Sequence, residues 1–333
     1  MTPHTTHKAQ IAWALSALLC LGACGNSAAP TTAAQSQTQA ASTATATQPA
    51  STAAAQPAIS AETQSIGLEG VGNARQLGGY VGEGGRKVKD GVLLRSAALT
   101  DATEADIARL KDVYHLAELV DLRMTRESDA KPEIQIDGVQ NVTLRIIDEE
   151  ALNKQMAELD PEKTKDLDLS DKLDQVKMST MTGLVSDQMY VNFLSSDTGK
   201  QGYTKLFQDL LALPEGRSLL FHCSQGKDRT GLAAMLILSA LGVDEQTIMA
   251  DFELTNVFNA KLIEQERQML ADKGYSGSEL DTMMMVMDQV NPAYMTNALN
   301  WLKENYGSVN GYITKELGVT DAQIKQLQDK FLV

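Results

Sequence analysis

Residues 219–231 read Leu-Leu-Phe-His-Cys-Ser-Gln-Gly-Lys-Asp-Arg-Thr-Gly, an apolar run that passes into a short polar loop. After His222 and Cys223, five residues follow before Arg229, and an apolar helical pattern then opens. A loop that enters a helix N-terminus directs unpaired backbone N–H groups and the positive end of the helix dipole at one point. Such a point binds anions, and the amides of the loop can curl around the same anion. The stretch therefore predicts a buried strand, an anion-binding loop and a buried helix, in that order.

Two side chains give this anion site a chemical use. Arg229 carries a planar guanidinium that can bond two oxygens of one phosphate, which a lysine cannot do. Cys223 lies under the positive field of the loop, where a thiol ionises more readily than in water. We expect a thiolate at neutral pH, aimed at the phosphorus of a bound phosphate group.

Strand and helix patterns alternate around this stretch. Short apolar runs predict strands over 91–96, 116–122, 139–147 and 218–222. Helical spacing predicts helices over 103–111, 203–213 and 230–241, with Gly242 as the C-cap glycine of the last. Alternating strands and helices, with a site at the carboxyl end of a strand, are typical of a doubly wound, mainly parallel α/β sheet flanked by helices.

The pattern changes over residues 149–200. Residues 149–176 are dense in Asp, Glu and Lys, while Leu and Met follow loose helical spacing. We predict a helical insertion that packs lightly on the core and forms a lid over the loop at Cys223. A solvated helical excursion with no gating role accounts for the same pattern, so both interpretations stay open.

The chain begins with the features of a secretory signal. Lys8 precedes an apolar run from Ile11 to Leu21, and residues 21–24 read Leu-Gly-Ala-Cys. A positive start, a short apolar core and small residues before a cut are typical of a signal peptide and too short to span a bilayer. The ending resembles a bacterial lipobox, which implies a signal peptide over 1–23, cleavage before Cys24 and acylation of Cys24. An ordinary signal peptide with a chance cysteine is the alternative.

Residues 24–61 are predicted to form a disordered tether. Residues 9–61 contain no charged side chain, and residues 27–61 are almost wholly Ala, Thr, Gln, Ser and Pro. Such a segment cannot bury enough apolar surface to offset the entropy of ordering it. We therefore expect a catalytic domain over 62–333, held outside the cytoplasm on the bacterial cell envelope by lipid at Cys24.

Charge and cysteine usage restrict the partners and cofactors. The chain carries a net charge of −14, which opposes general binding to nucleic acid or anionic membrane surfaces. Of its three cysteines, Cys20 would leave with the signal and Cys24 would carry lipid, so Cys223 would be the single thiol of the mature domain. A disulfide within the chain is then impossible. His115 and His222 alone would remain, too few for a metal site built from histidines, and we expect no metal or cofactor.

The sequence His-Cys-x-x-Gly-Lys-Asp-Arg-Thr-Gly resembles the Cys-x5-Arg loop of bacterial secreted tyrosine and lipid phosphatases of the atypical, dual-specificity-like group. Further blocks occur in the order expected for that family: Asn73 to Tyr80, Leu94 to Leu99, Val120 to Glu127, and Tyr306 to Thr320. Ala74 and Gln76 depart from the first of these blocks. The resemblance covers most of the chain from about Gly70 onward and implies a cysteine-phosphatase-like fold.

The resemblance also implies a two-step reaction. Cys223 attacks phosphorus in line to form a cysteinyl-phosphate, which water then hydrolyses. Substrate oxygens are bound by the Arg229 guanidinium and by the loop residues Ser224, Gln225, Gly226, Lys227, Asp228 and Arg229. Lys227 would add positive charge beyond the reacting phosphate, and similar loops with Lys at this position occur in phosphoinositide phosphatases.

Three neighbours of the nucleophile have expected supporting roles. Thr230 would donate its hydroxyl to the Cys223 sulfur. His222 would tune the thiolate through its ring hydrogen bonds, or would serve only as a structural residue at the strand end. Gly226 would supply a backbone angle that the loop requires.

The general acid is the residue that the motif specifies least. No Trp-Pro-Asp and no Pro-Asp sequence occurs in the chain, so the mobile acid loop of better-known tyrosine phosphatases has no counterpart. Asp228 in the loop is the first candidate, and the resemblance favours it as well. Asp121, at the end of a neighbouring strand, is the second candidate, with a structural carboxylate paired to an arginine as its alternative.

These features predict an exported, lipid-anchored phosphomonoesterase. A protein-tyrosine phosphatase is favoured, with dual or phosphoinositide specificity open because of Lys227. The expected partners are a phosphorylated protein, a phosphoinositide or an inositol phosphate as substrate, and a bilayer through acylated Cys24. The alternatives are an inositol-phosphate phosphatase, a non-catalytic phosphate-binding module, and a sulfur- or arsenate-transfer enzyme with a similar anion loop.

Overall fold

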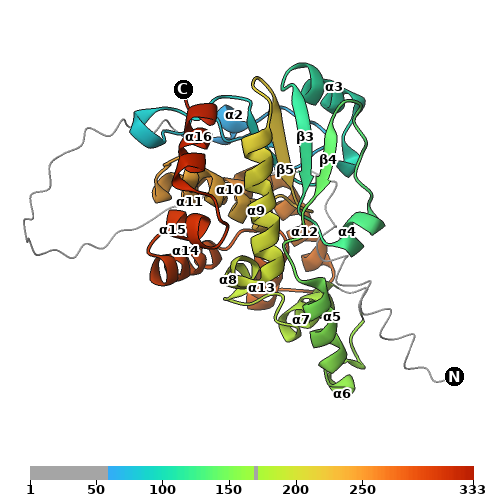
Figure 1. Cartoon of the computed structure of the whole chain (residues 1–333). Helices are drawn as coiled ribbons and strands as arrows, with labels where there is room; N and C mark the ends of the chain where they lie inside the picture. Colours follow the sequence, from blue (N-terminus) through green and yellow to red (C-terminus); the bar gives the residue numbers. More distant parts are fainter. Residues whose placement is uncertain (1–58, 169–171) are drawn as a thin grey trace, which may run out of the picture.

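The computed structural model describes residues 59–168 and 172–333 and contains a five-stranded sheet with helices on both faces (Figure 1). The strands lie in the order β1-β2-β5-β3-β4. Their bounds are β1 Arg75–Gln76, β2 Leu93–Ser96, β3 Leu116–Asp121, β4 Gln140–Thr143 and β5 Ser218–His222. β2, β5, β3 and β4 run parallel, and the edge strand β1 runs antiparallel to β2. The predicted doubly wound, mainly parallel α/β sheet is therefore confirmed.

Alternate side chains of the central strands enter two different cores. Leu219 and Phe221 of β5 lie in the larger core with α9 (Asp197–Ala212) and α10 (Asp228–Ala240). Leu220 lies in the smaller core with Leu110 of α3 (Glu104–Asp112). A parallel strand covered on both faces is apolar at successive positions, which explains the continuous run ahead of His222.

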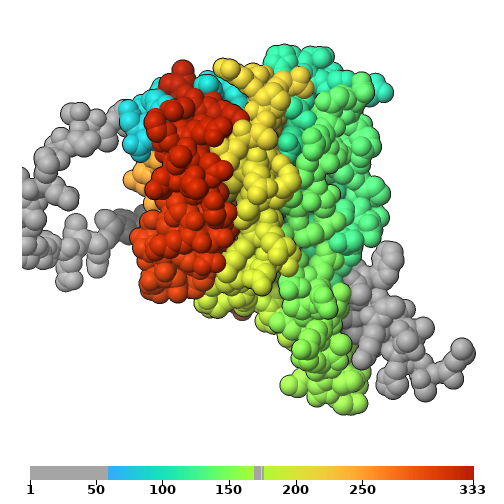
Figure 2. Space-filling view, viewed as in Figure 1, coloured from blue at the N-terminus to red at the C-terminus, as the bar shows by residue number. Residues whose placement is uncertain are grey.

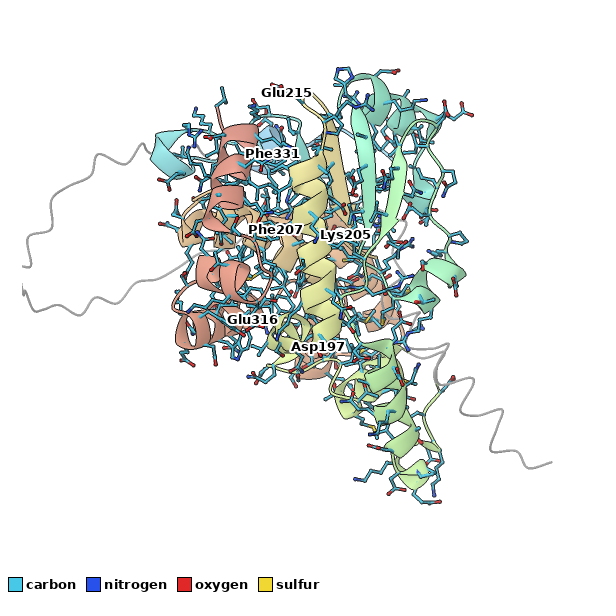
Figure 3. All side chains as sticks on the ribbon, in the orientation of Figure 1. Asp197, Lys205, Phe207, Glu215, Glu316 and Phe331 are labelled. Carbon is cyan, nitrogen blue, oxygen red and sulfur yellow. The ribbon has the colours of Figure 1, made fainter. Side chains whose placement is uncertain are left out.

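The C-terminal half of the chain builds most of the larger core. The helices that follow α10 are α11 Glu245–Phe258, α12 Ala260–Asp272, α13 Gly277–Met287, α14 Pro292–Tyr306, α15 Val309–Lys315 and α16 Asp321–Phe331. Of these, α12 and α13 contribute to a separate apolar cluster with Val176. Figure 3 shows Phe207 on the side of α9 that faces α16, and Lys205 on the opposite side. α10 is apolar all round because helices and strands surround it.

The shorter elements connect these layers. They are α2 Ala61–Gln64, α4 Thr125–Ala130 and the 3-10 helices η1 Glu83–Gly85 and η2 Leu99–Asp101. The bounds of several predicted elements change. β2 begins at Leu93 rather than Gly91, and β4 covers only 140–143 of the predicted 139–147. α9 begins at Asp197 rather than Tyr203, and α10 begins at Asp228 rather than Thr230. Asp228 suits the first turn of a helix because its carboxylate faces the positive end of the helix dipole.

The predicted insertion is helical over its described residues. It contains α5 Glu149–Glu158, α6 Pro161–Thr164, α7 Lys172–Met181 and α8 Met189–Ser195. α5 and α6 project from the rest of the molecule (Figures 1 and 2). The light packing predicted for the whole insertion is wrong for α8, where Tyr190, Phe193 and Leu194 are buried in the larger core.

The predicted signal peptide, Cys24 and nearly all of the tether fall within residues 1–58, which lie outside the described residues. Among the helices of 59–168 and 172–333, none is both long enough and apolar enough to cross a membrane.

Candidate active site

The site lies where β5 ends and α10 begins. β5 ends at His222, α10 begins at Asp228, and residues 223–227 form the loop between them. β5 is flanked by β2 and β3, so the loop emerges from the centre of the sheet at its carboxyl edge. Ligands of open parallel sheets bind at this edge. The fold therefore places the predicted anion loop where such a site is expected.

The carbonyl groups of the loop are bonded to the surrounding protein. Asn73 Nδ2 donates to the carbonyls of Gln225 and Gly226 at 3.1 and 2.9 Å, and Arg95 Nη2 donates to that of Gly226 at 2.9 Å. The backbone N–H of Ala98 donates to the carbonyl of Ser224 at 3.2 Å. In a trans peptide the N–H points opposite to the carbonyl, so the amides of residues 225–227 turn the other way. This is the arrangement that a cradle of amides around an anion requires.

Gly226 is required by its surroundings as well as by its backbone angle. Its φ is +67°, and a Cβ at this position would lie 2.4 Å from the carbonyl oxygen of Ser96. A side chain here would therefore push the loop away from β2. Gly231 meets a similar limit in α10, because a Cβ there would lie 2.9 Å from the ring of Phe252. Both glycine roles follow from close packing.

A buried ion network holds the residues that support the loop. Asp251 accepts from Arg75 Nε at 3.1 Å, from Tyr80 Oη at 3.1 Å and from Arg95 Nη1 at 2.6 Å. Burial alone would raise the pKa of Asp251, but Arg75 and Arg95 outweigh it and lower that pKa. Arg75 also donates to the side-chain oxygen of Asn73. The network thus fixes the two side chains, Asn73 and Arg95, that bond the loop carbonyls.

Arg229 is held by a buried carboxylate. Its Nη1 and Nη2 donate to the two oxygens of Glu127 at 2.6 and 3.0 Å, and Ser224 Oγ donates to Glu127 Oε1 at 2.5 Å. Burial would lower the pKa of Arg229 and raise that of Glu127, but their mutual attraction reverses both shifts. The pair is therefore charged, and the fork of Arg229 has one orientation. The sequence blocks contained Glu127 but did not reveal this role.

Cys223 is a free, buried cysteine with 2 % of its surface exposed. The Nδ1 atom of His222 lies 3.2 Å from the Cys223 carbonyl oxygen, so the ring is tied to the backbone of the nucleophile. His222 Nε2 lies 3.1 Å from an oxygen of Glu133. The Thr230 hydroxyl is buried and has no hydrogen-bond partner within the described part of the chain. Its expected contact with the Cys223 sulfur is not among the hydrogen bonds of the structure and stays a prediction.

Asp228 is bonded to a tyrosine of the insertion. Tyr190 Oη donates to Asp228 Oδ1 at 2.7 Å, and Asp228 Oδ2 lies 3.9 Å from the ammonium of Lys227. Asp228 also lines a pocket beside the loop. This position suits the predicted proton donor, and Tyr190 is a contact that the sequence did not suggest.

The Lys227 ammonium is engaged by the protein itself. It donates to the carbonyls of Val286 and Met287 at 2.8 and 2.9 Å and to that of Gln289 at 3.2 Å. The last carbonyls of a helix lack partners within the helix, so the end of α13 attracts a cation. The ammonium was expected to extend positive charge toward the substrate, whereas the structure directs it to α13. Its role in binding substrate stays a prediction.

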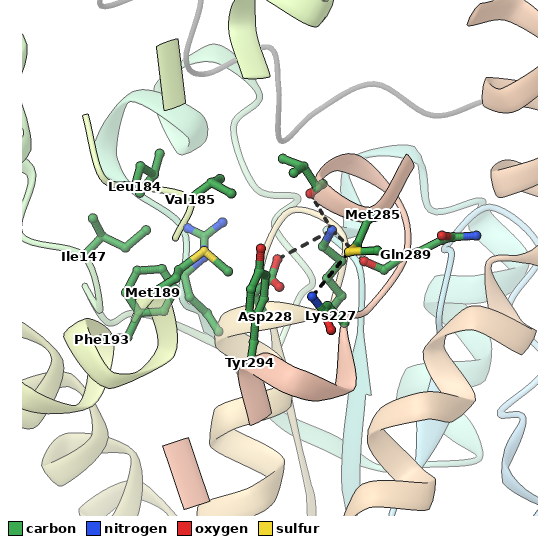
Figure 4. Close-up of a pocket in the computed structure, with 13 residues that line it drawn as sticks. Ile147, Leu184, Val185, Met189, Phe193, Lys227, Asp228, Met285, Gln289 and Tyr294 are labelled. Carbon is green, nitrogen blue, oxygen red and sulfur yellow. Dashed lines mark hydrogen bonds and ion pairs between the residues drawn. The ribbon is translucent and has the colours of Figure 1, made fainter. Parts of the chain in front are cut away.

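A small pocket, with a cavity volume of about 30 Å³, opens beside Asp228 and Arg229 (Figure 4). Its walls come from the insertion, from the last turn of α13 and from the residues that continue into the first turn of α14. The apolar lining residues are Ile147, Leu184, Val185, Met189, Phe193, Met285, Val286 and Tyr294. Residues 184–189 thus border the site, as a lid would, but their predicted gating role remains a prediction.

Asp121 belongs to a second buried network. Both of its oxygens accept from Arg123 at 2.9 Å, and Arg123 also donates to Glu133 at 3.0 Å. Burial would raise the pKa of Asp121, but His222 and Arg123 outweigh it and lower that pKa. The ligand atoms of Asp121, Glu133 and His222 lie within 4.8 Å of one another, a spacing open to a metal ion. Because Arg123 already donates to both carboxylates, the contacts favour the structural alternative for Asp121.

The comparisons with known proteins agree with this site. The family model described as the tyrosine phosphatase family matches residues 66–333. A Cupriavidus necator protein named as a candidate tyrosine-protein phosphatase is 28 % identical over 263 residues, which cover 78 % of this chain and 86 % of that protein. A tyrosine-protein phosphatase of Nostoc commune is 27 % identical over 67 % of this chain and 71 % of its own length.

A third relative matches a shorter part of the chain. The triple specificity protein phosphatase PtpB of Mycobacterium tuberculosis is 29 % identical over 129 residues, which cover 36 % of this chain and 46 % of PtpB. The enzyme class expected from the loop, a phosphatase, is confirmed by these matches. The chain that carries the loop at Cys223 therefore belongs to the tyrosine phosphatase family.

Proposed function

We propose that the protein hydrolyses phosphomonoesters through a cysteinyl-phosphate on Cys223. One observation carries this proposal: Cys223 opens a loop whose carbonyls are bonded outward and whose Arg229 is oriented by Glu127 and Ser224. This geometry leaves the loop amides, the Nε–H of Arg229 and one Nη2 hydrogen to bind the phosphate oxygens, because Glu127 and the Leu122 carbonyl take the other guanidinium donors. Preorganised donors of this kind stabilise the charge that moves onto those oxygens in the transition state.

The first step forms a bond between the Cys223 sulfur and phosphorus and breaks the bond between phosphorus and the ester oxygen. Asp228 gives its proton to the departing oxygen, which leaves as an alcohol or phenol. In the second step, water gives a proton to Asp228 and attacks phosphorus, and the Cys223 thiolate departs. The Thr230 hydroxyl, which has no partner within the described part of the chain, would bond that thiolate.

We infer that phosphotyrosine in a protein is the favoured substrate. The pocket beside Asp228 and Arg229 has apolar walls that suit an aromatic ring, and the Lys227 ammonium is occupied by the carbonyls of Val286, Met287 and Gln289. A substrate with several phosphates would require Lys227 to leave those carbonyls. Dual or phosphoinositide specificity, and an inositol phosphate as substrate, therefore depend on a rearrangement of Lys227.

A rate panel tests both parts of the proposal. It compares a phosphotyrosine peptide, a phosphoserine peptide, a phosphoinositide in vesicles and a soluble inositol phosphate, with Cys223→Ser as the blank. The proposal predicts the highest kcat/KM for the phosphotyrosine peptide, inhibition by vanadate and no turnover by Cys223→Ser. Turnover by Cys223→Ser would contradict the mechanism, and a higher rate with inositol phosphate would contradict the substrate.

We also propose that the protein is exported and anchored by lipid at Cys24. The support is the Leu-Gly-Ala-Cys sequence at residues 21–24 and the uncharged segment that follows. Labelled fatty acid should enter the wild-type protein in bacterial cells and should be absent from Cys24→Ala. Equal labelling of both proteins would contradict the anchor.

A further inference from the structure

Tyr190 contacts the candidate acid from outside the catalytic loop. Its hydroxyl donates to Asp228 Oδ1 at 2.7 Å, and it belongs to α8, a helix of the insertion. No other direct hydrogen bond between the insertion and residues 223–230 is present among the described side chains. The contact therefore joins the projecting part of the molecule to the site of the reaction.

The ring of Tyr190 has little freedom to move. Only 1 % of the residue is exposed, and its ring packs against those of Phe193, Phe252 and Tyr294 at centroid distances of 6.3, 6.0 and 5.8 Å. Phe252 in turn lies against Gly231 of α10. The aromatic cluster thus fixes the hydroxyl relative to the first turn of α10.

The hydrogen bond distinguishes the two oxygens of Asp228. Burial and the nearby Asp228 raise the pKa of Tyr190 well above its usual value, so the hydroxyl keeps its proton. A tyrosine hydroxyl has one hydrogen to donate. A proton on Oδ1 would meet that hydrogen across a 2.7 Å contact, whereas a proton on Oδ2 leaves the bond intact. The protonated form of Asp228 therefore carries its hydrogen on Oδ2.

We propose that Tyr190 is a positioning residue that assigns the transferable proton of Asp228 to Oδ2 and holds the carboxyl group toward the departing oxygen. The inference rests on the proposed role of Asp228 as general acid. It gives the insertion a part in the chemistry that does not depend on gating. Tyr190 of α8 orients the carboxyl group of Asp228, which is the first residue of α10.

The test uses Tyr190→Phe, which keeps the ring and removes the hydroxyl. In the reactive form Asp228 is protonated and neutral, and loss of one hydrogen bond to a neutral group corresponds to about a two- to tenfold change in rate. We expect about that loss in kcat with a phosphotyrosine peptide or an alkyl phosphate, whose departing oxygen needs a proton. With a dinitrophenyl phosphate, whose departing oxygen does not, the rate should change by less than about twofold.

Tyr312→Phe is the matched control. Tyr312 is equally buried, and its hydroxyl donates to the Leu194 carbonyl of the same helix at 2.7 Å without contacting Asp228. If loosening of α8 were the cause, both variants would slow the peptide reaction alike. We expect Tyr312→Phe to keep the wild-type ratio between the two substrates, and thermal unfolding will show whether either variant is destabilised.

A double-mutant cycle with Asp228→Asn completes the test. Because Tyr190 acts through Asp228, adding Tyr190→Phe to Asp228→Asn should slow the peptide reaction no further. Fully multiplicative effects, or equal slowing of both substrates by Tyr190→Phe, would overturn the positioning role alone. Equal slowing of both substrates by Asp228→Asn would instead show that the acid assignment is wrong, and the inference about Tyr190 would fall with it.

Discussion

The stretch from β5 to α10 and the insertion from α5 to α8 both contribute to the site, but only the contribution of the first can be recognised from a local sequence pattern. The first places its strand, loop and helix within residues 218–240, so the chemistry is visible as a local pattern. The insertion contributes through packing, as α8 directs Tyr190 to Asp228 and residues 184–189 line the pocket. From this comparison we infer a division of roles in which the loop would hold the phosphate, while the insertion would shape the acid and the access route.

The largest effect is expected from removing Glu127, the carboxylate that holds Arg229 of the phosphate-binding loop region. In Glu127→Ala the guanidinium stays buried without its carboxylate, which commonly costs about 3–5 kcal/mol of stability. We expect a loss of this size in the free energy of unfolding measured with denaturant, and about 10²–10³ in kcat because the phosphate donor loses its orientation. Glu245→Ala, which breaks the exposed pair with Lys303, is the control and should leave both quantities almost unchanged. An unaltered kcat in Glu127→Ala would contradict the role of Glu127.

The second prediction concerns the contact between Lys227 and α13. Lys227→Met removes the cation that bonds the carbonyls of Val286, Met287 and Gln289. Carbonyls left without a partner should lower the stability by about 1–3 kcal/mol. If Lys227 serves mainly this contact, kcat/KM for a phosphotyrosine peptide should fall by a smaller factor than the one to which the lost free energy of unfolding corresponds. A selective collapse of kcat/KM in a protein of wild-type stability would show that Lys227 binds substrate directly.

The third prediction separates access from assembly. Deleting residues 152–176 removes most of α5 to α7, including Val176, which packs against Met283 and Met284 of α13. We expect Cys223 to react several-fold faster with hydrogen peroxide because the segment that borders the pocket is less supported. Tyr190 remains in the deletion variant, so its effect on the two test substrates should persist. An unchanged oxidation rate would contradict the lid and favour a solvated excursion.

The smallest expected effect lies away from the site and depends on pH. Burial and the neighbouring Asp209 raise the pKa of Glu118 from 4.5 to about 7. The folded protein thus keeps Glu118 protonated where the unfolded chain does not, and this contribution to stability is lost as the pH rises through about 7. Glu118→Gln should therefore raise the free energy of unfolding by roughly 1–2 kcal/mol at pH 8 and by much less at pH 5. Equal effects at both pH values would contradict the raised pKa.

The sequence predicts the loop region well because its determinants are local. β5 has the predicted bounds, and Gly226 has the predicted special backbone angle, with φ at +67°. The start of α10 differs from the prediction because the prediction followed the apolar spacing, and Asp228 is polar. Asp228 is nevertheless part of the first turn, where its negative charge interacts favourably with the helix dipole. The mainly parallel sheet follows from the alternation of strands and helices, which does not determine the order of the strands.

The remaining features depend on contacts between distant parts of the chain. Glu127 and Arg229, or Asn73 and Gly226, are far apart in sequence, and no spacing rule relates them. The charge of Lys227 predicts contact with a substrate phosphate, but its ammonium donates to two carbonyls in the last turn of α13 and to the carbonyl of Gln289 just after it. Tyr190 lies outside the charge-rich residues 149–176, in an apolar segment that carries no motif, and only the fold brings it to Asp228.

The central claim, that Cys223 carries the phosphoryl group during turnover, has one direct test. The wild-type protein is mixed with a phosphotyrosine peptide labelled in its phosphate, quenched within a turnover, digested and analysed for phosphorylated peptides. Label should appear on the peptide that contains Cys223, should accumulate when hydrolysis is slowed by Thr230→Ala, and should be absent in Cys223→Ser. The account would be contradicted if the wild-type enzyme released product while label was never found on Cys223, either in the wild-type protein or in Thr230→Ala.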